Sequence, residues 1–566
     1  MLKGTGVSAG IGIGRALLIE EHSLEYTPVT ITEPQAEKER FNEAVKSFCE
    51  NTRRQAEALR ASVGEKEAGI MLGHISIIED PFLTGEVGKL IDGGQCAEAA
   101  LEQICDMFIS IFSAAGDDLT RQRAADVRDV RTGVLRALLG ISEVNISDVP
   151  KDSIIVVREL TPSMAAGINK ENVAGIIAGT GSTTSHSAIL ARVLEIPAVM
   201  SVDDAFMSIR GGDTVICDGT AGTVIVSPVE EELKEYIDKR DCFVKEKAEL
   251  ENYRGKPTVS ADGTRYELVC NIGKPDDAAK AVENDGEGVG LFRTEYLFMD
   301  KTSVPTEEEQ FDAYKKAALI LKDKPLIIRT LDIGGDKEIP YLGLEKEDNP
   351  FMGFRAIRYC LKYTALFRSQ LRAIIRASAF GNVSIMFPLI TCVEELRAGK
   401  MLVEEIKDEL REQKTAFDEN IKVGIMIETA AAAVIADILA KESDFFSIGT
   451  NDLTGYTMAC DRGNGSVAYL YSVLQPSVLR MIKRTIECAA AEGIPVGMCG
   501  EAAADPLMTP LLISFGLNEF SVAAPSVLRL RKNISAWTKE KADAAAAKAM
   551  SLNTQAEIRA YLSSVI

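Results

Sequence analysis

The 566-residue sequence is poor in the side chains that most often bind metals or build disulfide frameworks. It contains only three histidines, and its eleven cysteines form no CxxC pair and show no regular spacing. Structural zinc sites and disulfide-stabilised domains depend on such spacing, so this pattern is typical of reduced thiols. We therefore expect neither kind of site, and we expect a cytoplasmic protein.

Long hydrophobic runs are also missing. No apolar stretch reaches the 18 or so residues needed to cross a bilayer, and the mean hydropathy is close to zero. The first residues, MLKGTGVSAGIGIGRALLIEE, are rich in glycine. They show no positively charged start followed by a cleavage site of small residues, which argues against a signal peptide. We expect no direct membrane insertion.

Positive charge is scarce relative to negative charge. The chain has 63 lysines and arginines against 84 aspartates and glutamates, a net charge of -21 at pH 7. A nucleic acid would be repelled over most of such a surface, so we expect no nucleic-acid partner. Solubility is the simplest interpretation of this acidity, and a basic protein partner is the functional alternative.

The pattern of the chain predicts several domains. Residues 33–139 carry apolar side chains at spacings of three and four, typical of a helical bundle, and β-branched runs begin at Ile154. Residues 1–20 look extended and can pair with those later strands, which would make the bundle an insertion. We expect an α/β domain from 1–20 plus 145–228, an inserted helical bundle at 21–144, a linker helix at 229–258 and a further domain at 259–566.

The C-terminal half contains eight short apolar runs, most of them followed by a helical segment. Strands buried on both faces lack clean polar alternation, and these runs lack it. Eight such units predict a (β/α)8 TIM barrel. The runs are 267–272, 288–292, 325–333, 383–390, 422–428, 445–449, 495–500 and 519–523.

Reactive side chains lie where five of these runs end, which is the edge that carries the active site in this type of barrel. Any single one of them is more often a salt-bridged residue at the rim, but six residues at five strand ends favour a functional site. They are Arg293, Arg329, Glu428, Asn451, Asp452 and Cys499.

These residues suit phosphoryl transfer. Arg293 and Arg329, with Arg462 from the DRGN loop, can grip an anionic group through paired hydrogen bonds. Glu428 and Asp452 are hard oxygen donors of the kind that bind Mg²⁺. Phosphoryl transfer depends mainly on positioning and on neutralising charge, which this combination provides.

His186 lies in a different setting, between two serines at the start of a predicted helix. A strand ending at Ala178 and a glycine-containing turn precede it in GTGSTTSHSAILAR. An imidazole that carries a phosphoryl group needs backbone N–H donors and a favourable dipole, and a helix N-terminus supplies both. This context favours a nucleophile over a structural histidine.

Taken together and in this order, the motifs resemble the phosphoenolpyruvate-protein phosphotransferases, the enzyme I family of the bacterial sugar phosphotransferase system. The resemblance covers essentially the full chain. It rests on GSTTSHSAILAR, GVGLFRTEYLFM, IIRTLDIGGDK, NPFMGFRAIR, IMIETAAA, FFSIGTNDLTGYTMACDRGN and GMCGEAAAD, with GHISIIED and RAADVRDV in the bundle.

The resemblance implies an activity and the roles of the site residues. His186 would accept the phosphoryl group of phosphoenolpyruvate within a swivelling domain, and Cys499 would protonate the enolate to give pyruvate. The bundle would bind the phosphocarrier protein HPr, and the barrel would form a homodimer. The resemblance also implies that Arg293, Arg329 and Arg462 bind the phosphate group with the help of Asn451, and that Arg355 lies near the substrate. Glu428 and Asp452 would be the Mg²⁺ ligands.

The sequence departs from the family pattern at six positions, none of which is an expected ligand. Two of them lie in the barrel motifs, and four lie near the N-terminus and the histidine loop. Such changes would affect substrate affinity, loop geometry or domain closure. The departures are Ala9, Ala165, Ser182, Thr183, Ala430 and Gly455.

Three other interpretations compete with this one. A pyruvate phosphate dikinase-like enzyme needs an additional ATP-grasp domain of about 200 residues, for which the chain has no room. A catalytically weak regulatory paralogue that binds phosphoenolpyruvate has no use for a proton donor such as Cys499. A soluble scaffold does not explain why polar residues gather at the strand ends.

Overall fold

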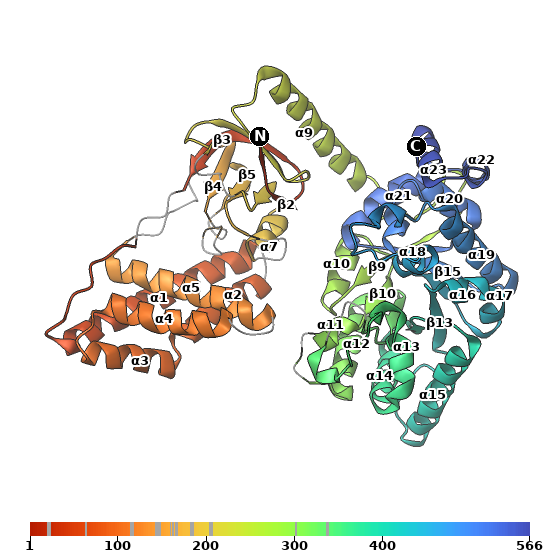
Figure 1. The fold of residues 1–566 in the computed structure, drawn as a ribbon, viewed down its shortest axis with the longest axis horizontal. Coiled ribbons are helices and arrows are strands. Elements are labelled where there is room, and N and C mark those ends of the chain that lie inside the picture. Colours follow the sequence, from red (N-terminus) through yellow and green to blue (C-terminus); the bar gives the residue numbers. More distant parts are fainter. Residues whose placement is uncertain are drawn as a thin grey trace. The chain divides into compact units, whose positions relative to one another are not determined.

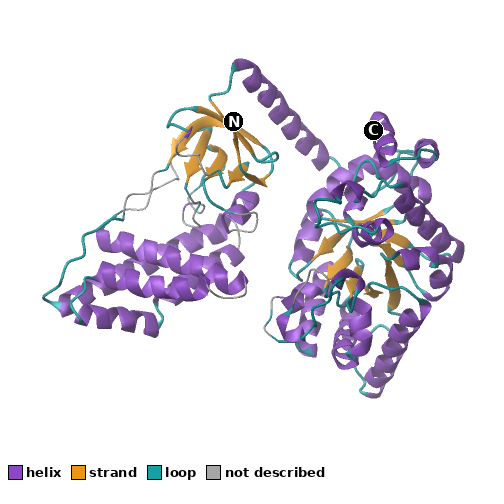
Figure 2. Cartoon of the chain, in the orientation of Figure 1, coloured by secondary structure: helices purple, strands orange, loops and turns teal. Residues whose placement is uncertain are grey.

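The computed structural model divides into two compact units, Met1–Lys247 and Ala248–Ile566, with the boundary inside helix α9 (Glu230–Glu251). Figures 1 and 2 show the helices and strands of each unit. The structure describes residues 1–566 apart from 20–23, 63–64, 114–117, 142–148, 159, 161–163, 165–167, 182–185, 203–207, 300, 302 and 335–338.

The first unit contains an eight-stranded mixed sheet with the order β1-β8-β7-β3-β4-β5-β6-β2. The first three strands come from the start of the chain, so residues 1–20 join the sheet as the sequence predicts. Strand β3 runs parallel to β4 and antiparallel to β7. The strands are β1 (Leu2–Lys3), β2 (Thr5–Ser8), β3 (Ile11–Leu18), β4 (Ser153–Val157), β5 (Val173–Ala178), β6 (Ala198–Met200), β7 (Thr214–Asp218) and β8 (Thr223–Val226).

The glycines of β3 are required by close backbone contacts across the sheet. A Cβ on Gly14 would lie 1.9 Å from the carbonyl oxygen of Asp152, and one on Gly12 would lie 2.1 Å from that of Ala174. These contacts explain why the N-terminal strand is so rich in glycine. Strand β6 was not predicted, because three residues following Pro197 are too few to show a pattern.

Between β3 and β4 the chain forms the predicted helical bundle. The buried core includes Phe41, Leu83, Leu101 and Val130. Leu190 of α7 packs in a cluster with Ala56 and Met71, so the helix that begins at His186 contacts the bundle. The helices are α1 (Pro34–Ser62), α2 (Glu65–Ile78), α3 (Pro81–Asp92), α4 (Ala97–Ser113) and α5 (Asp118–Leu139), with α7 (His186–Val193) in the sheet domain.

The second unit is a closed barrel of eight parallel strands, and each strand comes from one of the eight predicted runs. The strands follow one another around the barrel in chain order, with β16 closing against β9. They are β9 (Glu267–Ile272), β10 (Val289–Arg293), β11 (Leu326–Arg329), β12 (Val383–Phe387), β13 (Lys422–Ile427), β14 (Phe446–Ile448), β15 (Val496–Met498) and β16 (Glu519–Val522).

Helices cover the outer face of the barrel strands (Figure 2). The helices of this unit are α10 (Asp277–Glu283), α11 (Glu295–Met299), α12 (Glu307–Leu321), α13 (Ala356–Lys362), α14 (Thr364–Ala377), α15 (Val393–Glu412), α16 (Ala430–Val434), α17 (Ala436–Leu439), α18 (Thr450–Met458), α19 (Pro476–Glu492), α20 (Thr509–Phe515), α21 (Val527–Ser535), α22 (Lys539–Met550) and α23 (Gln555–Val565).

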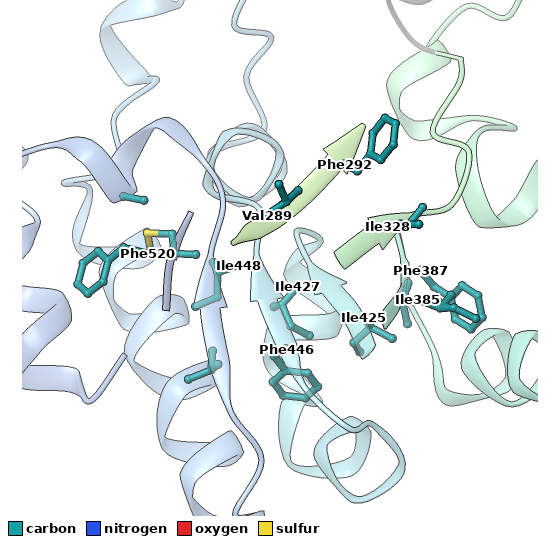
Figure 3. Close-up of a cluster of buried hydrophobic side chains, with 14 of the residues drawn as sticks. Val289, Phe292, Ile328, Ile385, Phe387, Ile425, Ile427, Phe446, Ile448 and Phe520 are labelled. Carbon is teal, nitrogen blue, oxygen red and sulfur yellow. The ribbon is translucent and has the colours of Figure 1, made fainter. Parts of the chain in front are cut away.

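Alternate residues of each barrel strand face opposite sides. Phe292, Ile427, Ile448 and Phe520 belong to the large core between strands and helices (Figure 3). Their neighbours along the strands therefore face the barrel interior, where a smaller cluster includes Met426 and Cys499. This alternation fixes which side chains can reach the active-site end from inside.

None of the helices in the described part of the chain is long and apolar enough to cross a membrane.

Replacing Phe520 by alanine is expected to lower the free energy of unfolding of the barrel by about 3–5 kcal/mol. The ring is fully buried and packs edge-on against Tyr266 at 5.9 Å between ring centroids. Urea unfolding followed by the fluorescence of Trp537, the one tryptophan of the sequence, measures the loss, since Trp537 packs on the same core.

Tyr469→Ala is the matched control, because this aromatic side chain of the same unit is 71% exposed. Its change in unfolding free energy is expected to stay below about 0.5 kcal/mol. A loss below about 1 kcal/mol for Phe520→Ala would contradict the described packing.

Candidate active site

A cavity of about 640 Å³ opens at the carboxyl end of the barrel strands. All eight of the barrel residues that the sequence singles out lie around it, although they come from six segments spread over more than 200 residues. The predicted residues in its lining are Arg293, Arg329, Arg355, Glu428, Asn451, Asp452, Arg462 and Cys499.

The strands themselves place most of these side chains. Arg293 and Arg329 are the last residues of the neighbouring strands β10 and β11, and they are register partners of each other. Glu428 directly follows β13, and Cys499 directly follows β15. A parallel barrel brings the carboxyl ends of its strands to one rim, so a side chain at or just after such an end lies in the site.

Arg329 is held by two buried carboxylates. Its Nη2 donates to Oε1 of Glu295 at 2.7 Å, and its Nη1 lies 3.1 Å from Oδ2 of Asp332. Burial opposes the charged guanidinium, but Glu295, Asp332 and Glu428 outweigh that effect and raise the pKa of Arg329. Its Nε is buried and has no hydrogen-bond partner among the described residues, which leaves a donor for a bound anion.

Arg355 shares Asp332 with Arg329. Its Nη2 donates to Oδ1 of Asp332 at 2.8 Å and lies 3.5 Å from Oδ2 of Asp452. Its Nη1 donates to the Tyr456 hydroxyl at 3.4 Å, and the Tyr456 hydroxyl in turn donates to the carbonyl of Phe351. Two buried guanidinium groups are thus fixed around one carboxylate.

Glu428 is a buried acid, with 2% of its surface exposed. Its Oε1 accepts a hydrogen bond from the backbone N–H of Leu389 at 2.6 Å. Burial raises the pKa of Glu428, and the neighbouring Asp452 and Asp332 raise it further. A Cβ on Gly449 would lie 3.0 Å from Oε2 of Glu428, so the glycine leaves room for this carboxylate.

Asn451 and Asp452 lie in the first turn of α18, directly after β14. The Asn451 amide is paired with Glu501, whose backbone N–H donates to Oδ1 of Asn451 at 3.3 Å. The hydroxyl of Tyr471 donates to the Asn451 carbonyl at 2.9 Å. These contacts hold the start of α18 at the rim, while the exposed Arg462 follows the same helix.

Cys499 lines the cavity, with 3% of its surface exposed. Its backbone N–H donates to the Ile448 carbonyl at 3.1 Å, and its thiol contacts the same oxygen at 3.7 Å. Burial raises the pKa of Cys499 to about 11, an effect that Ser447 and Arg329 partly oppose. The thiol is therefore protonated at neutral pH.

His186 lies in the other unit, as the first residue of α7 after β5 and the turn at Gly181. Gly181 has a φ of +131°, a conformation that favours glycine, as the sequence predicts for this turn. Among the departures from the family pattern, Ser182 and Thr183 of this loop and Ala165 lie outside the described residues.

The other departures are compatible with the fold. Ala9 is exposed between β2 and β3. Ala430 is the first residue of α16, where proline is also well accommodated, and Thr429 caps that helix by accepting from the N–H of Ala432. Gly455 lies inside α18, where a Cβ would lie 3.2 Å from the carbonyl oxygen of Cys460.

Comparison with protein families assigns all three parts of the chain to one group. Residues 3–123 match the family described as PEP-utilising enzyme, N-terminal, and residues 149–222 match PEP-utilising enzyme, mobile domain. Residues 247–538 match PEP-utilising enzyme, PEP-binding domain.

A curated protein of Bacillus subtilis (strain 168) named phosphoenolpyruvate-protein phosphotransferase is 45% identical to this chain, with 99% of each chain covered. The chain belongs to the phosphoenolpyruvate-protein phosphotransferase family. The protein of that name from Geobacillus stearothermophilus is 44% identical over 99% of this chain and 97% of its own. A solution structure described as Enzyme I (nEIt) is 33% identical over 43% of this chain and 99% of its own, with a TM-score of 0.39.

Sequence reasoning missed the buried acids that hold the two arginines. Glu295 and Asp332 are each 2% exposed, and both line the cavity. Their spacing from Arg293 and Arg329 within RTEYLFM and RTLDIGG offered a signal. A carboxylate two or three residues beyond a strand can face several directions, however, and only the fold shows that these two turn inward.

Cys499 of this family member is expected to react with iodoacetamide far more slowly than the exposed Cys242. The thiolate is the reactive form, and a pKa raised to about 11 leaves about one Cys499 thiol in a thousand ionised at pH 8. Its rate should rise tenfold per pH unit up to that pKa. Mass spectrometry of each labelled peptide between pH 7 and 9 measures both rates, and equal rates would contradict the buried, protonated thiol.

Proposed function

We propose that this protein transfers the phosphoryl group of phosphoenolpyruvate to its own His186, releases pyruvate, and passes the phosphoryl group to the histidine of HPr. This is the first step of the sugar phosphotransferase system. The observation that carries the proposal is the cavity that gathers four arginines, five acids, an amide and a thiol at one barrel rim. Membership of the phosphoenolpyruvate-protein phosphotransferase family supports it.

Phosphoenolpyruvate is a trianionic substrate with phosphate and carboxylate groups. Arg293, Arg329 and Arg462 bind its phosphate together with the Asn451 amide, and Arg355 completes the cationic wall. Guanidinium groups match planar oxygen clusters through paired hydrogen bonds. The Nε atoms of Arg329 and Arg355 are buried donors of this kind, with no hydrogen-bond partner in the part of the chain that the structure describes.

Mg²⁺ fits two of the acids of the cavity, Glu428 and Asp452. The charge of Asp452 raises the pKa of Glu428, and a bound cation would favour the ionised form of Glu428 again. No group of three or more His, Cys, Asp or Glu ligands occurs among the described residues, so substrate and water must supply the remaining oxygens. When bound, the metal supplies charge neutralisation for the transferring phosphoryl group.

Cys499 is the proton donor in this proposal. Its raised pKa keeps the S–H bond intact at neutral pH, and its place in the cavity lining lets it protonate the methylene carbon of the enolate. The sulfur is left as a thiolate once the new C–H bond forms. A protein that only bound phosphoenolpyruvate would gain nothing from this thiol.

His186 receives the phosphoryl group by in-line attack of its neutral imidazole on phosphorus. The N-terminus of α7 provides backbone N–H groups and a dipole that stabilise the phosphohistidine. We propose that residues 1–20 and 145–228 move as a phosphohistidine domain between the barrel mouth and the place of transfer, with the linker 229–258 as hinge. Residues 259–566 form the substrate-binding barrel.

The bundle at 21–144 is the proposed docking site for HPr. It presents Phe82, Met107 and Ile111 with between 41% and 58% of their surfaces exposed. Exposed apolar groups of this size are typical of protein contacts. The histidine helix α7 contacts the bundle through Leu190, which packs against α1 and α2.

We further propose a homodimer through the barrel, and a cytoplasmic location. The barrel unit exposes apolar side chains such as Met352, Val434 and Ile438, each at least 46% exposed, which a second copy would cover. All eleven cysteines are free, which suits a reducing compartment.

Incubation with phosphoenolpyruvate labelled in the phosphate, in the presence of Mg²⁺, tests the proposed function. We expect acid-labile label on the wild-type protein and none on His186→Ala, because phosphohistidine hydrolyses in acid. Peptide mapping identifies the labelled residue. Label that survives acid, or that persists in His186→Ala, would refute His186 as acceptor.

Cys499→Ala is expected to slow pyruvate formation by about 10²–10⁴-fold, the usual loss for a missing general acid. Phosphoenolpyruvate binding should change little, since the thiol does not grip the phosphate. Rapid-quench measurement of pyruvate, together with calorimetric titration of phosphoenolpyruvate, separates the two effects. Unchanged pyruvate formation would remove Cys499 from the mechanism.

A further inference from the structure

A buried glutamine lies behind the strand ends that carry the active site, in the layer of helices around the barrel. Gln370 belongs to α14 and is completely buried. It is not among the described residues that line the cavity. A buried amide costs free energy unless its donors and its acceptor are paired, so the partners of Gln370 show what it holds in place.

The amide of Gln370 is fully paired with groups at two strand ends and on one helix. Its Oε1 accepts a hydrogen bond from the backbone N–H of Leu331 at 2.8 Å. Its Nε2 donates to the hydroxyl of Thr294 at 3.1 Å and to that of Tyr314, on α12, at 3.3 Å. Because both N–H groups and the oxygen are engaged, the amide is fixed in one orientation.

The hydroxyl of Thr294 continues this network to the neighbouring strand. It accepts from Gln370 and donates to the backbone carbonyl of Arg329 at 2.8 Å. Thr294 directly follows Arg293, and Arg293 and Arg329 are register partners. One hydroxyl therefore ties the end of β10 to the end of β11 at the position of the two arginines.

The pleat of the strands places the arginines on one side and the network on the other. Phe292 and Ile328, each one residue before an arginine, belong to the core between strands and helices (Figure 3). Arg293 and Arg329 therefore face the interior, and both line the cavity. The Thr294 hydroxyl faces outward again, since it pairs with the amide on α14.

The other arm of the network reaches the carboxylate that two arginines share. Leu331 is fully buried, and its N–H has its partner in Oε1 of Gln370. Leu331 directly precedes Asp332, whose carboxylate contacts Arg329 and Arg355. Fixing the backbone at Leu331 fixes the point from which the Asp332 side chain starts. One amide outside the cavity thus acts on both parts of the arginine cluster.

We propose that Gln370 and Thr294 are positioning residues for phosphate binding, an inference that rests on the proposed function. They set the spacing between the backbones of Arg293 and Arg329, so that both guanidinium groups reach the same phosphate group. Paired hydrogen bonds to phosphate require such spacing. A misplacement of about 1 Å, even one caused far from the reacting atoms, can cost about 100-fold in rate.

A role in stability alone is the alternative, because buried hydrogen bonds also stabilise a fold. Thr330 offers the comparison that separates the two roles. It is fully buried and directly follows Arg329, and its hydroxyl finds no hydrogen-bond partner in the described part of the chain. Removing that hydroxyl changes the same region and leaves the network intact.

Calorimetric titration of the full-length protein with phosphoenolpyruvate and Mg²⁺ tests the proposal. Every protein carries His186→Ala, so that phosphoenolpyruvate binds without being consumed. Thr294→Val keeps the shape of the side chain and removes the hydroxyl, and Gln370→Met keeps its length and removes the amide. Each is expected to weaken phosphoenolpyruvate binding about tenfold or more. Thr294→Ser retains the hydroxyl and should restore most of the affinity.

Thr330→Val is the matched control, because it makes the same change at a hydroxyl outside the network. Its dissociation constant should equal that of the parent protein. Urea unfolding, followed by the fluorescence of Trp537, is measured on every variant. A purely structural role would lower the free energy of unfolding in Thr294→Val and leave phosphoenolpyruvate binding at the parent value.

The outcomes distinguish this inference from the proposed function. Parent affinity in both Thr294→Val and Gln370→Met would overturn the inference. Equal weakening in Thr294→Ser or in Thr330→Val would also overturn it, because the Thr294 hydroxyl would then not be the cause. Two variants on different elements keep the test decisive if one of them folds poorly. If the parent protein itself failed to bind phosphoenolpyruvate, the proposed function would fail instead.

Discussion

The rest of the cavity depends on the sharing of Asp332 between two buried guanidinium groups. Arg329 and Arg355 contact opposite oxygens of this carboxylate, at 3.1 and 2.8 Å. Two buried cations without a common anion would repel each other and would lose their hydration without compensation. Glu295 and Asp452 extend the network, so that both guanidinium groups are held rigidly at the rim. A preorganised arrangement of this kind stabilises a transferring phosphoryl group better than mobile surface arginines could.

The barrel and its rim residues could be predicted from sequence because parallel strands leave two regular traces. Strands buried on both faces give short apolar runs, and their carboxyl ends converge on one edge. Arg293, Arg329, Glu428 and Cys499 each sit at or just past such an end, so counting along the strand was sufficient. The identity of the family followed from the same motifs.

The parts that could not be predicted depend on geometry between segments. Asp332 lies only three residues from Arg329, but its second partner, Arg355, is reached across a loop whose path the sequence does not reveal. Strand β6 is three residues long and gains its order from β5 and β2 on either side. The strand glycines that lie against the carboxyl group of Glu519 look ordinary until that contact is seen.

Helix α9 has no buried residue along its 22 positions. Its helical form is therefore sustained by local propensity and by ion pairs such as Lys239 with Glu235, with no packed core to reinforce it. As a helix it spans about 33 Å, and unwinding would roughly double that reach. The local concentration of one unit near the other falls as such a tether lengthens. Partial melting of this connector would therefore change how often the two units meet.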